Sequence, residues 1–326
     1  MTKIDLITGI LGSGKTTFLM KYAKHLIDKG MKIAILENDF GAVNVDMMLL
    51  QELKCDNCQL EMVAGGGDPC CHKRRFKTQL ISLGMQNFDR VIVEPSGIFD
   101  MDEFFDTLHE SPLDRWFEIG SIITIIDAET DEKLPEQMEY LFGSEAACCG
   151  KLVLSKRSSF PDESDEHISE RLITHLNNSL EDIKCDRRFS PRDIFIPQND
   201  VFSNDDFSML MSAGYRGSSY IKKFSGDDII SGVHYFMHIA VDKEMLPKLI
   251  DDIFNDDNCG NIMRIKGSVP DYPDGWIKIN ATREKTELSH VREGQSVIIT
   301  IGEHLRRERI DSHILRYNTD TGFVSM

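Results

Sequence analysis

The chain has 326 residues, of which 41% are hydrophobic and 28% are charged, so it can bury a substantial core and form about two domains. Lys and Arg total 37 against 54 Asp and Glu, which gives a formal net charge of −17. So acidic a chain is a poor general partner for nucleic-acid backbone or anionic lipid. No apolar run approaches a membrane span, and Asp5 interrupts the apolar start of the chain. We therefore expect a soluble, cytosolic protein with no nucleic-acid or membrane partner.

Short apolar segments alternate with helical ones over residues 1–198. A helix is expected from Thr16 to Lys29, with Gly30 as its stop. Alternation of this kind predicts an α/β domain in which a parallel sheet carries helices on both faces. The segments that predict its buried strands are 3–8, 32–37, 90–94, 121–127, 151–155 and 193–196.

The pattern changes in the second half of the chain. Residues 199–231 are rich in Ser, Asp, Asn and Gly and are interpreted as a connecting region. Residues 232–326 predict a smaller α+β domain. Its expected strands are 233–241, 262–266, 276–280 and 296–301, and its expected helices are 245–254 and 305–314.

The segment after the first strand has the full phosphate-loop (P-loop) pattern. It reads Gly9-x4-Gly14-Lys15-Thr16, with a strand before it and a helix after it. Glycines let backbone N–H groups close around phosphate oxygens, and the helix N-terminus favours negative charge. Lys15 would hold the β- and γ-phosphates, and the Thr16 hydroxyl would bind Mg²⁺. The expected nucleotide contacts in this segment are Gly9, Gly12, Ser13, Gly14, Lys15, Thr16 and Thr17.

Acidic residues follow two of the predicted strands, at the sheet edge where open parallel sheets bind ligands. Glu94 could bind Mg²⁺ or position the attacking water, or be a simple strand-end acid. Asp39 could contact the metal or the water, or cap a turn. A nucleotide hydrolase needs an acid near Mg²⁺ and a segment that responds to the γ-phosphate, so Lys15, Asp39 and Glu94 are the candidate catalytic residues.

With these motifs, the chain resembles the CobW-like metallochaperone GTPases, relatives of the nickel-insertion GTPases of urease and hydrogenase maturation. The P-loop, Asn38–Gly41, Glu94–Gly97 and the Asp127 strand end carry the resemblance, and 264–267 and 296–301 extend it to the C-terminal domain. The resemblance implies binding and slow hydrolysis of GTP with Mg²⁺ and delivery of a transition metal to a metalloprotein client or a cofactor pathway. It implies that Asp39 lies in the first nucleotide switch, and Glu94 and Gly97 in the second.

Two motifs depart from the family pattern. The family's Gly-Cys-x-Cys-Cys metal motif reads Gly67-Asp68-Pro69-Cys70-Cys71 here. The family's base-recognition motif, Asn-Lys-x-Asp, reads Ser155-Lys156-Arg157-Ser158. Without the Asp carboxylate at position 158, a charge-assisted contact with guanine is lost. Ser155 and Lys156 remain candidate nucleotide contacts, and we expect a purine nucleotide with reduced guanine preference, GTP ahead of ATP.

Four of the eight cysteines, Cys55, Cys58, Cys70 and Cys71, lie within 17 residues that include the altered metal motif. In an extended segment Asp68, Cys70 and His72 would share a face and Cys71 would point the other way. Carboxylate, thiolate and imidazole are acceptable ligands for Zn²⁺ or Co²⁺. Cys55 and Cys58, spaced as a metal pair, could add two thiolates and make a four-sulfur site. The alternative is that all these cysteines are reduced thiols without a metal.

These observations predict a Mg²⁺-dependent nucleotide hydrolase that couples nucleotide state to transition-metal binding. The alternative is a nucleotide-binding module that regulates or reactivates a metalloprotein partner with little turnover, which the altered base motif favours. A small-molecule kinase is a weaker third interpretation, because the thiols would then have no purpose. The sequence leaves the metal, the client and homodimer formation open.

Overall fold

The structure of the chain is a computed structural model. It describes residues 1–38, 50–63, 69–95, 101–224, 233–283, 285–292 and 294–325. These residues divide into two compact units. The first comprises the described residues up to 224, and the second those from 233 onward. Each is described separately below.

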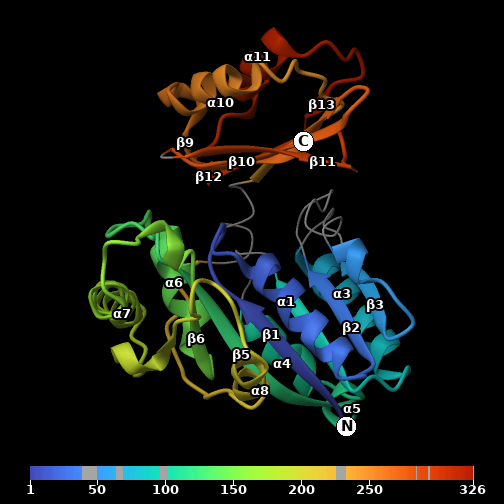
Figure 1. The fold of residues 1–326 in the computed structure, drawn as a ribbon, viewed down its shortest axis with the longest axis vertical. Helices are drawn as coiled ribbons and strands as arrows, with labels where there is room; N and C mark the ends of the chain where they lie inside the picture. The colour runs from blue at the N-terminus through green and yellow to red at the C-terminus, as the bar shows by residue number, and fades with distance from the viewer. Residues whose placement is uncertain are drawn as a thin grey trace. The chain divides into compact units, whose positions relative to one another are not determined.

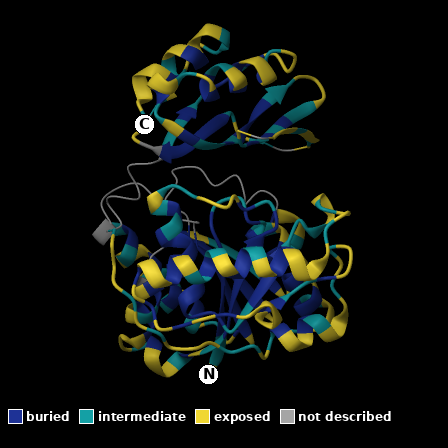
Figure 2. Ribbon diagram, turned by 90° about the vertical axis from the view of Figure 1, so that its left-hand side faces the viewer, coloured by how far each residue is buried: buried dark blue, intermediate teal, exposed yellow. Residues whose placement is uncertain are grey.

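The first unit is built on a parallel sheet, as expected. Its described strands lie in the order β3-β2-β4-β1-β5-β6-β7, and every neighbouring pair is parallel. Helices cover both faces (Figure 1), so the inner strands are mainly coloured as buried (Figure 2), whereas the edge strand β3 is mostly partly exposed. The strands are β1 (Thr2–Thr8), β2 (Ile33–Asn38), β3 (Cys58–Val63), β4 (Arg90–Pro95), β5 (Phe117–Asp127), β6 (Lys151–Ser155) and β7 (Ile194–Phe195).

The helices of this unit connect successive strands. Helix α1 (Lys15–Asp28) turns a buried stripe that includes Phe18, Tyr22 and Leu26 toward the sheet. It ends as predicted, where the N–H of Gly30, at φ +78°, donates to Ile27 O at 2.8 Å. The other α-helices that the structure describes in this unit are α3 (Pro69–Gly84), α4 (Met101–His109), α5 (Leu113–Trp116), α6 (Glu136–Ala147), α7 (Asp165–Asp182) and α8 (Asn204–Leu210). Short 3₁₀ turns are η1 (Gln51–Leu53), η2 (Arg157–Ser159) and η3 (Pro191–Asp193).

The stretch 199–231 was expected as a connecting region, yet its described part up to residue 224 belongs to the first unit. Helix α8 packs beside α1, where His25 Nδ1 and Asn204 Oδ1 are 3.0 Å apart. The Phe207 side chain is buried there, its ring 6.0 Å from that of Tyr22. A few apolar residues in a polar stretch are enough to fix it to the larger unit.

The described part of the second unit is an antiparallel sheet with helices on one face (Figure 1). Its described strands lie in the order β11-β10-β9-β12-β8-β13. Helices α10 (Leu246–Phe254) and α11 (Arg307–Tyr317) close a core that includes Leu249, Ile265 and Ile314. The strands are β8 (Val233–Met237), β9 (Asn261–Asp271), β10 (Gly275–Ala281), β11 (Thr286–Val291), β12 (Val297–Glu303) and β13 (Val324–Ser325), with a 3₁₀ turn η4 (Asp257–Cys259).

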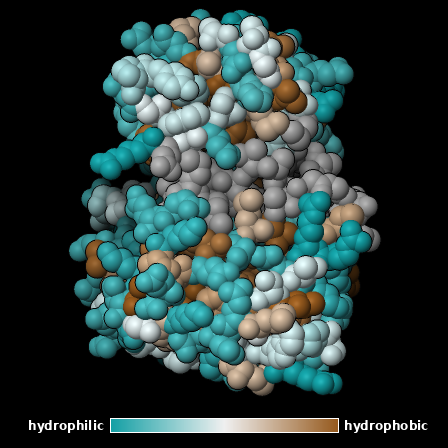
Figure 3. Space-filling model, turned by 90° about the vertical axis from the view of Figure 1, so that its right-hand side faces the viewer, coloured by the Kyte–Doolittle hydropathy of each residue, from teal (hydrophilic) through white to brown (hydrophobic). Residues whose placement is uncertain are grey.

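Polar residues predominate on the part of the molecular surface that Figure 3 shows, with apolar residues scattered over it. Among the helices that the structure describes, none combines the length and the apolar character needed to cross a bilayer.

Candidate nucleotide and metal site

The P-loop connects β1 to α1 and is held against the sheet. Gly9, Gly12 and Gly14 have φ of +136°, +88° and +94°, a region that only glycine adopts readily. A Cβ on Gly9 would lie 2.4 Å from Ile125 O. Gly14 is the N-cap of α1 and provides no side-chain cap. The first N–H groups of α1 therefore remain available for an anion.

Lys15 is the cation of this loop. Its side chain is buried, and Nζ donates to Gly9 O at 2.6 Å and to Ile10 O at 3.5 Å. Both acceptors are neutral carbonyl oxygens of the loop itself. An anionic phosphate oxygen at the loop would be a stronger acceptor for the ammonium group.

Gly9 also contacts a buried acid that the sequence motifs do not include. Its N–H donates to Glu145 Oε2 at 2.7 Å. Glu145 lies on α6 and is 1% exposed. Burial raises the pKa of Glu145 to about 7, against the Lys15 charge and the Gly9 hydrogen bond, which lower it. No spacing rule relates this residue to the loop, because the fold alone brings α6 beneath it.

Thr16 and Glu94 meet at the carboxyl edge of the sheet. Thr16 Oγ1 donates to Glu94 Oε1 at 2.8 Å, and the Glu94 side chain is buried at the end of β4. Glu37 on β2 is the register partner of Glu94 and is also buried, although the motif analysis did not select it. A hydroxyl and a carboxylate are the oxygen donors that Mg²⁺ takes, so Thr16 and Glu94 fit this ion. Asp39 and Gly97 lie outside the described residues.

The altered base-recognition motif follows β6. Ser155 Oγ donates to Ser13 O, which ties the motif to the P-loop. Lys156 has φ +53°, and its Nζ contacts Asp127 Oδ2 and, at 2.9 Å, Glu129 Oε2. Its ammonium group is thus paired with two carboxylates at the edge of the site.

A carboxylate from another loop occupies the turn in which Ser158 replaces the family's Asp. Asp200 accepts the backbone N–H groups of Arg157 and Ser158, each at 3.2 Å. Asp200 itself has φ +57°. The sequence alone does not indicate this contact, because it joins positions more than forty apart in the chain.

The predicted thiol cluster is not extended. Pro69 begins helix α3, so Cys70, Cys71 and His72 occupy consecutive helical positions about 100° apart, and alternate residues do not share a face. The physical reason is that proline suits the first turn of a helix. Asp68 and the Cys70 side chain lie outside the described residues. Cys71 is partly exposed, and burial followed by the Arg75 charge lowers the pKa of His72 to about 4.

Cys55 and Cys58 are placed away from this group. They form a tight turn at the start of β3, with Cys58 N donating to Cys55 O at 3.0 Å. Helix α3 begins after the other end of that strand, and five strand intervals span roughly 17 Å. Burial, and then the neighbouring Cys55, raises the pKa of Cys58 to about 12. The structure therefore does not bring these thiols together with Cys71 into a four-sulfur site.

Comparisons with known proteins place this site in context. Residues 3–183 match the family model of the CobW/HypB/UreG nucleotide-binding domain. The zinc chaperone YeiR of Escherichia coli is 30% identical over 51% of this chain and 50% of its own length. The zinc chaperone YjiA of the same organism is 31% identical over 40% of this chain and 42% of its own.

A further relative aligns over more of the chain. The zinc-regulated GTPase metalloprotein activator 1 of Dictyostelium discoideum is 23% identical over 81% of this chain and 59% of its own length. The chain thus spans about half the length of the curated relatives it matches, which is 50%, 42% and 59% for these three proteins.

Proposed function

Because the chain belongs to the CobW/HypB/UreG family through its nucleotide-binding domain, we propose that it is a Mg²⁺-dependent nucleoside triphosphatase that handles a zinc-class metal. GTP is the proposed substrate, ahead of ATP. The metal is the cargo, destined for a metalloprotein client or a cofactor pathway. The observation that supports this function best is the meeting of Lys15, Thr16 and Glu94 at one edge of the sheet.

Each residue of the P-loop has a role in this proposal. Lys15 leaves the Gly9 and Ile10 carbonyl oxygens and binds a β- or γ-phosphate oxygen, beside the free N–H groups of α1. Thr16 Oγ1 and the Glu94 carboxylate would hold Mg²⁺, directly or through water. When bound, Mg²⁺ neutralises negative charge that develops on the phosphates. Asp39 or Glu94 orients the attacking water.

The strand order supports coupling between nucleotide and cargo metal. Strands β3, β2 and β4 are adjacent, and Thr16 meets Glu94 at the carboxyl end of β4. The cysteine motif follows the carboxyl end of β3, so the proposed cargo ligands, Cys70 with Asp68, Cys71 or His72, begin at the same sheet edge. A nucleotide-dependent change at this edge would alter the affinity for metal, and the metal would alter the affinity for nucleotide equally. Zinc is the proposed cargo because the relatives named above are zinc chaperones and a zinc-regulated activator.

Phosphate release from GTP and from ATP, each with Mg²⁺, tests the enzymatic part. Lys15→Ala should lower the rate about 100-fold or more, because one charged donor to the transition state is lost. Lys24→Ala is the matched control, since Lys24 is exposed on the same helix. Equal rates in Lys15→Ala and the unaltered chain would contradict the proposal.

A second candidate is a nucleotide-binding module that regulates or reactivates a metalloprotein partner with negligible turnover. Ser158, in place of the family's Asp, is the residue that favours it. This candidate predicts Lys15-dependent binding of nucleotide without phosphate release from either GTP or ATP.

A further inference from the structure

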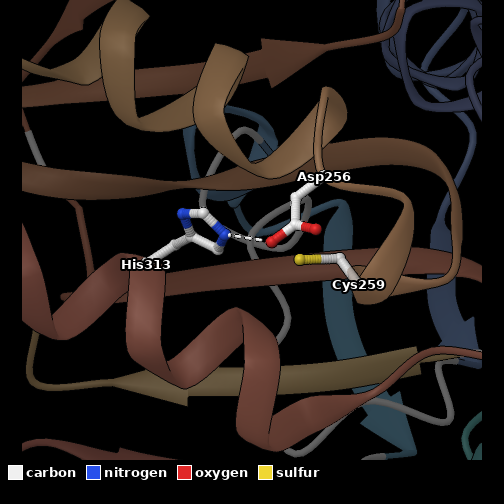
Figure 4. A group of neighbouring side chains, drawn as sticks. All are labelled: Asp256, Cys259 and His313. Atoms are coloured by element: carbon white, nitrogen blue, oxygen red, sulfur yellow. Dashed lines mark hydrogen bonds and ion pairs between the residues drawn. The ribbon is translucent and has the colours of Figure 1, made fainter.

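Three side chains with metal-binding atoms converge in the second unit, far from the P-loop in the sequence. They are Asp256 and Cys259, in the loop between α10 and β9, and His313 on α11 (Figure 4). A carboxylate oxygen, the thiol sulfur and a ring nitrogen all lie within 4.8 Å of one another. Among the residues that the structure describes, no other group of three such residues meets this criterion.

From these contacts we propose that Asp256, Cys259 and His313 form a zinc-class metal site in the C-terminal unit, separate from the cysteine motif of the nucleotide-binding unit. Carboxylate, thiolate and imidazole are all common zinc ligands. Atoms bound to one tetrahedral zinc lie roughly 3.3–3.8 Å apart, given bond lengths of about 2.0–2.3 Å. Atom pairs that lie up to 4.8 Å apart would therefore need to close by roughly 1.0–1.5 Å, and His313 Nε2 and Asp256 Oδ2, now 2.7 Å apart, would separate by about 0.6 Å.

The loop already has the form that a metal-binding turn needs. Asp256 and Cys259 have the x₂ spacing of paired zinc ligands. Cys259 N donates to Asp256 O at 2.8 Å, and Asp256 Oδ1 accepts the N–H of Asn258 at 3.0 Å. Gly260 follows at φ +98°, where a Cβ would lie 2.5 Å from His304 O. These contacts fix the two side chains on the same side of the turn before any metal binds.

Helix α11 is fixed to the same loop. The N–H of Arg306 donates to Cys259 O at 2.9 Å, just before the helix begins. His313 Nε2 lies 2.7 Å from Asp256 Oδ2. Arg309 also contacts this oxygen, but its side chain is 46% exposed and can move toward solvent. A metal at Oδ2 would replace the hydrogen bond between His313 and Asp256 and displace the Arg309 ion pair, while both ligands stay in place.

The ligand side chains are buried, so few water molecules compete with a metal for them. Cys259 is fully buried, and His313 is 5% exposed. In the form described here, Nδ1 of His313 is buried without a hydrogen-bond partner. A shift of the ring proton from Nε2 to Nδ1 frees Nε2 for the metal and breaks no bond at Nδ1. The Cys259 thiol proton goes to water when the sulfur coordinates.

Three protein ligands leave the fourth position of a tetrahedral ion open. Closed structural sites have four protein ligands, whereas this site would keep a water or exchange it for another ligand. The site is therefore suited to hold zinc reversibly. The proposal of this metal site does not depend on the proposed nucleotide hydrolysis.

Zinc and cobalt binding to the full-length chain test this site. The starting variant is Cys55→Ala, Cys70→Ala and Cys71→Ala together, which removes three of the four predicted thiol ligands of the first unit and leaves only the buried Cys58. We expect it to retain one Zn²⁺ per chain in equilibrium dialysis. With Co²⁺ it should show the thiolate-to-metal charge-transfer absorption of a single coordinated cysteine.

Adding Cys259→Ala should abolish that absorption and weaken Zn²⁺ binding at least tenfold, and adding His313→Gln should weaken Zn²⁺ binding by a similar factor. Cys185→Ala is the matched control, because Cys185 is also buried but belongs to no such group. Circular dichroism confirms that each variant is folded. Absence of stoichiometric zinc from the starting variant, or unchanged zinc binding after Cys259→Ala, would overturn the proposal. Phosphate release from GTP is measured in parallel and should not change with Cys259→Ala.

Discussion

The backbone N–H of Gly9 donates to the buried carboxylate of Glu145 at 2.7 Å, so the first glycine of the P-loop is held by an acid from α6. Glu145 is positioned by the fold and has no counterpart in the P-loop motif. Its raised pKa gives this contact a pH dependence that can be measured.

Glu145→Gln should remove part of the pH dependence of stability. The pKa of Glu145 is about 7 in the folded chain, against an ordinary value of 4.5, so between these values the folded state binds more protons than the unfolded state. The contribution of Glu145 to the free energy of unfolding is therefore fully present below pH 4.5 and is lost as the pH rises to about 7. Each pH unit in this window costs up to about 1.4 kcal/mol.

The measurement is urea unfolding at pH 5 and at pH 7.5. From pH 5 to pH 7.5, the free energy of unfolding should fall by roughly 1–3 kcal/mol more in the unaltered chain than in Glu145→Gln. The reason is that glutamine keeps an acceptor for the Gly9 N–H but does not ionise. Equal losses in the two chains would show that Glu145 does not titrate in this window.

The buried ion pair of Asp5 and Arg90 should be essential for stability. Arg90 Nη1 donates to both carboxylate oxygens of Asp5, at 2.7 and 2.6 Å, and the two side chains are 0% and 6% exposed. Arg90→Met would leave the Asp5 charge buried without its partner and should cost about 3–5 kcal/mol.

Lys3→Met is the control for this prediction. Lys3 also lies on β1, but its ion pair with Glu118 spans 3.4 Å and both side chains are about half exposed. In urea unfolding, Lys3→Met should lower the free energy of unfolding by less than about 1 kcal/mol. If both variants lost a similar free energy of unfolding, burial would not be the reason why the Asp5–Arg90 pair stabilises the fold.

Asp200→Asn should reduce the preference for GTP over ATP. The Asp200 carboxylate lies at the turn where Ser158 replaces the family's Asp, and is the group we expect to accept the guanine N–H donors. Asparagine tolerates the positive φ but presents an amide that can repel those donors. GTP affinity should fall roughly tenfold to a hundredfold, with ATP affinity little changed.

Nucleotide binding measured by calorimetry checks this prediction, with Asp205→Asn as the control. Asp205 is exposed on the first turn of α8. If Asp200→Asn weakened the binding of GTP and of ATP equally, Asp200 would stabilise the turn without contacting the base.

The main features of the first unit could be predicted because local sequence and fold agree there. Strand, glycines and helix follow one another at the P-loop, and the apolar segments are nearly continuous. The edge strand β3 was missed because Gln59 and Glu61 interrupt its apolar pattern. Helix α3 was misread at its start because Pro69 suits both an extended segment and a first helical turn.

The parts of the sites that could not be predicted depend on contacts between distant segments. Glu145 meets Gly9 across 136 positions, and His313 meets Asp256 across 57. Cys55 and Cys58 have a metal-like spacing, but the length of β3 separates them from Cys71. Spacing predicts a local ligand pair, whereas the course of the chain decides which pairs meet.

Zinc affinity in two nucleotide states tests the central claim most directly. It is measured by competition with a chromophoric chelator, with GDP and with a non-hydrolysable GTP analogue, in the Cys259→Ala chain so that the C-terminal site does not contribute. The account predicts Kd values for Zn²⁺ that differ between the two nucleotides by about fivefold or more, and a difference that disappears in Lys15→Ala. The same Kd for Zn²⁺ with both nucleotides would contradict coupling between the P-loop and the metal.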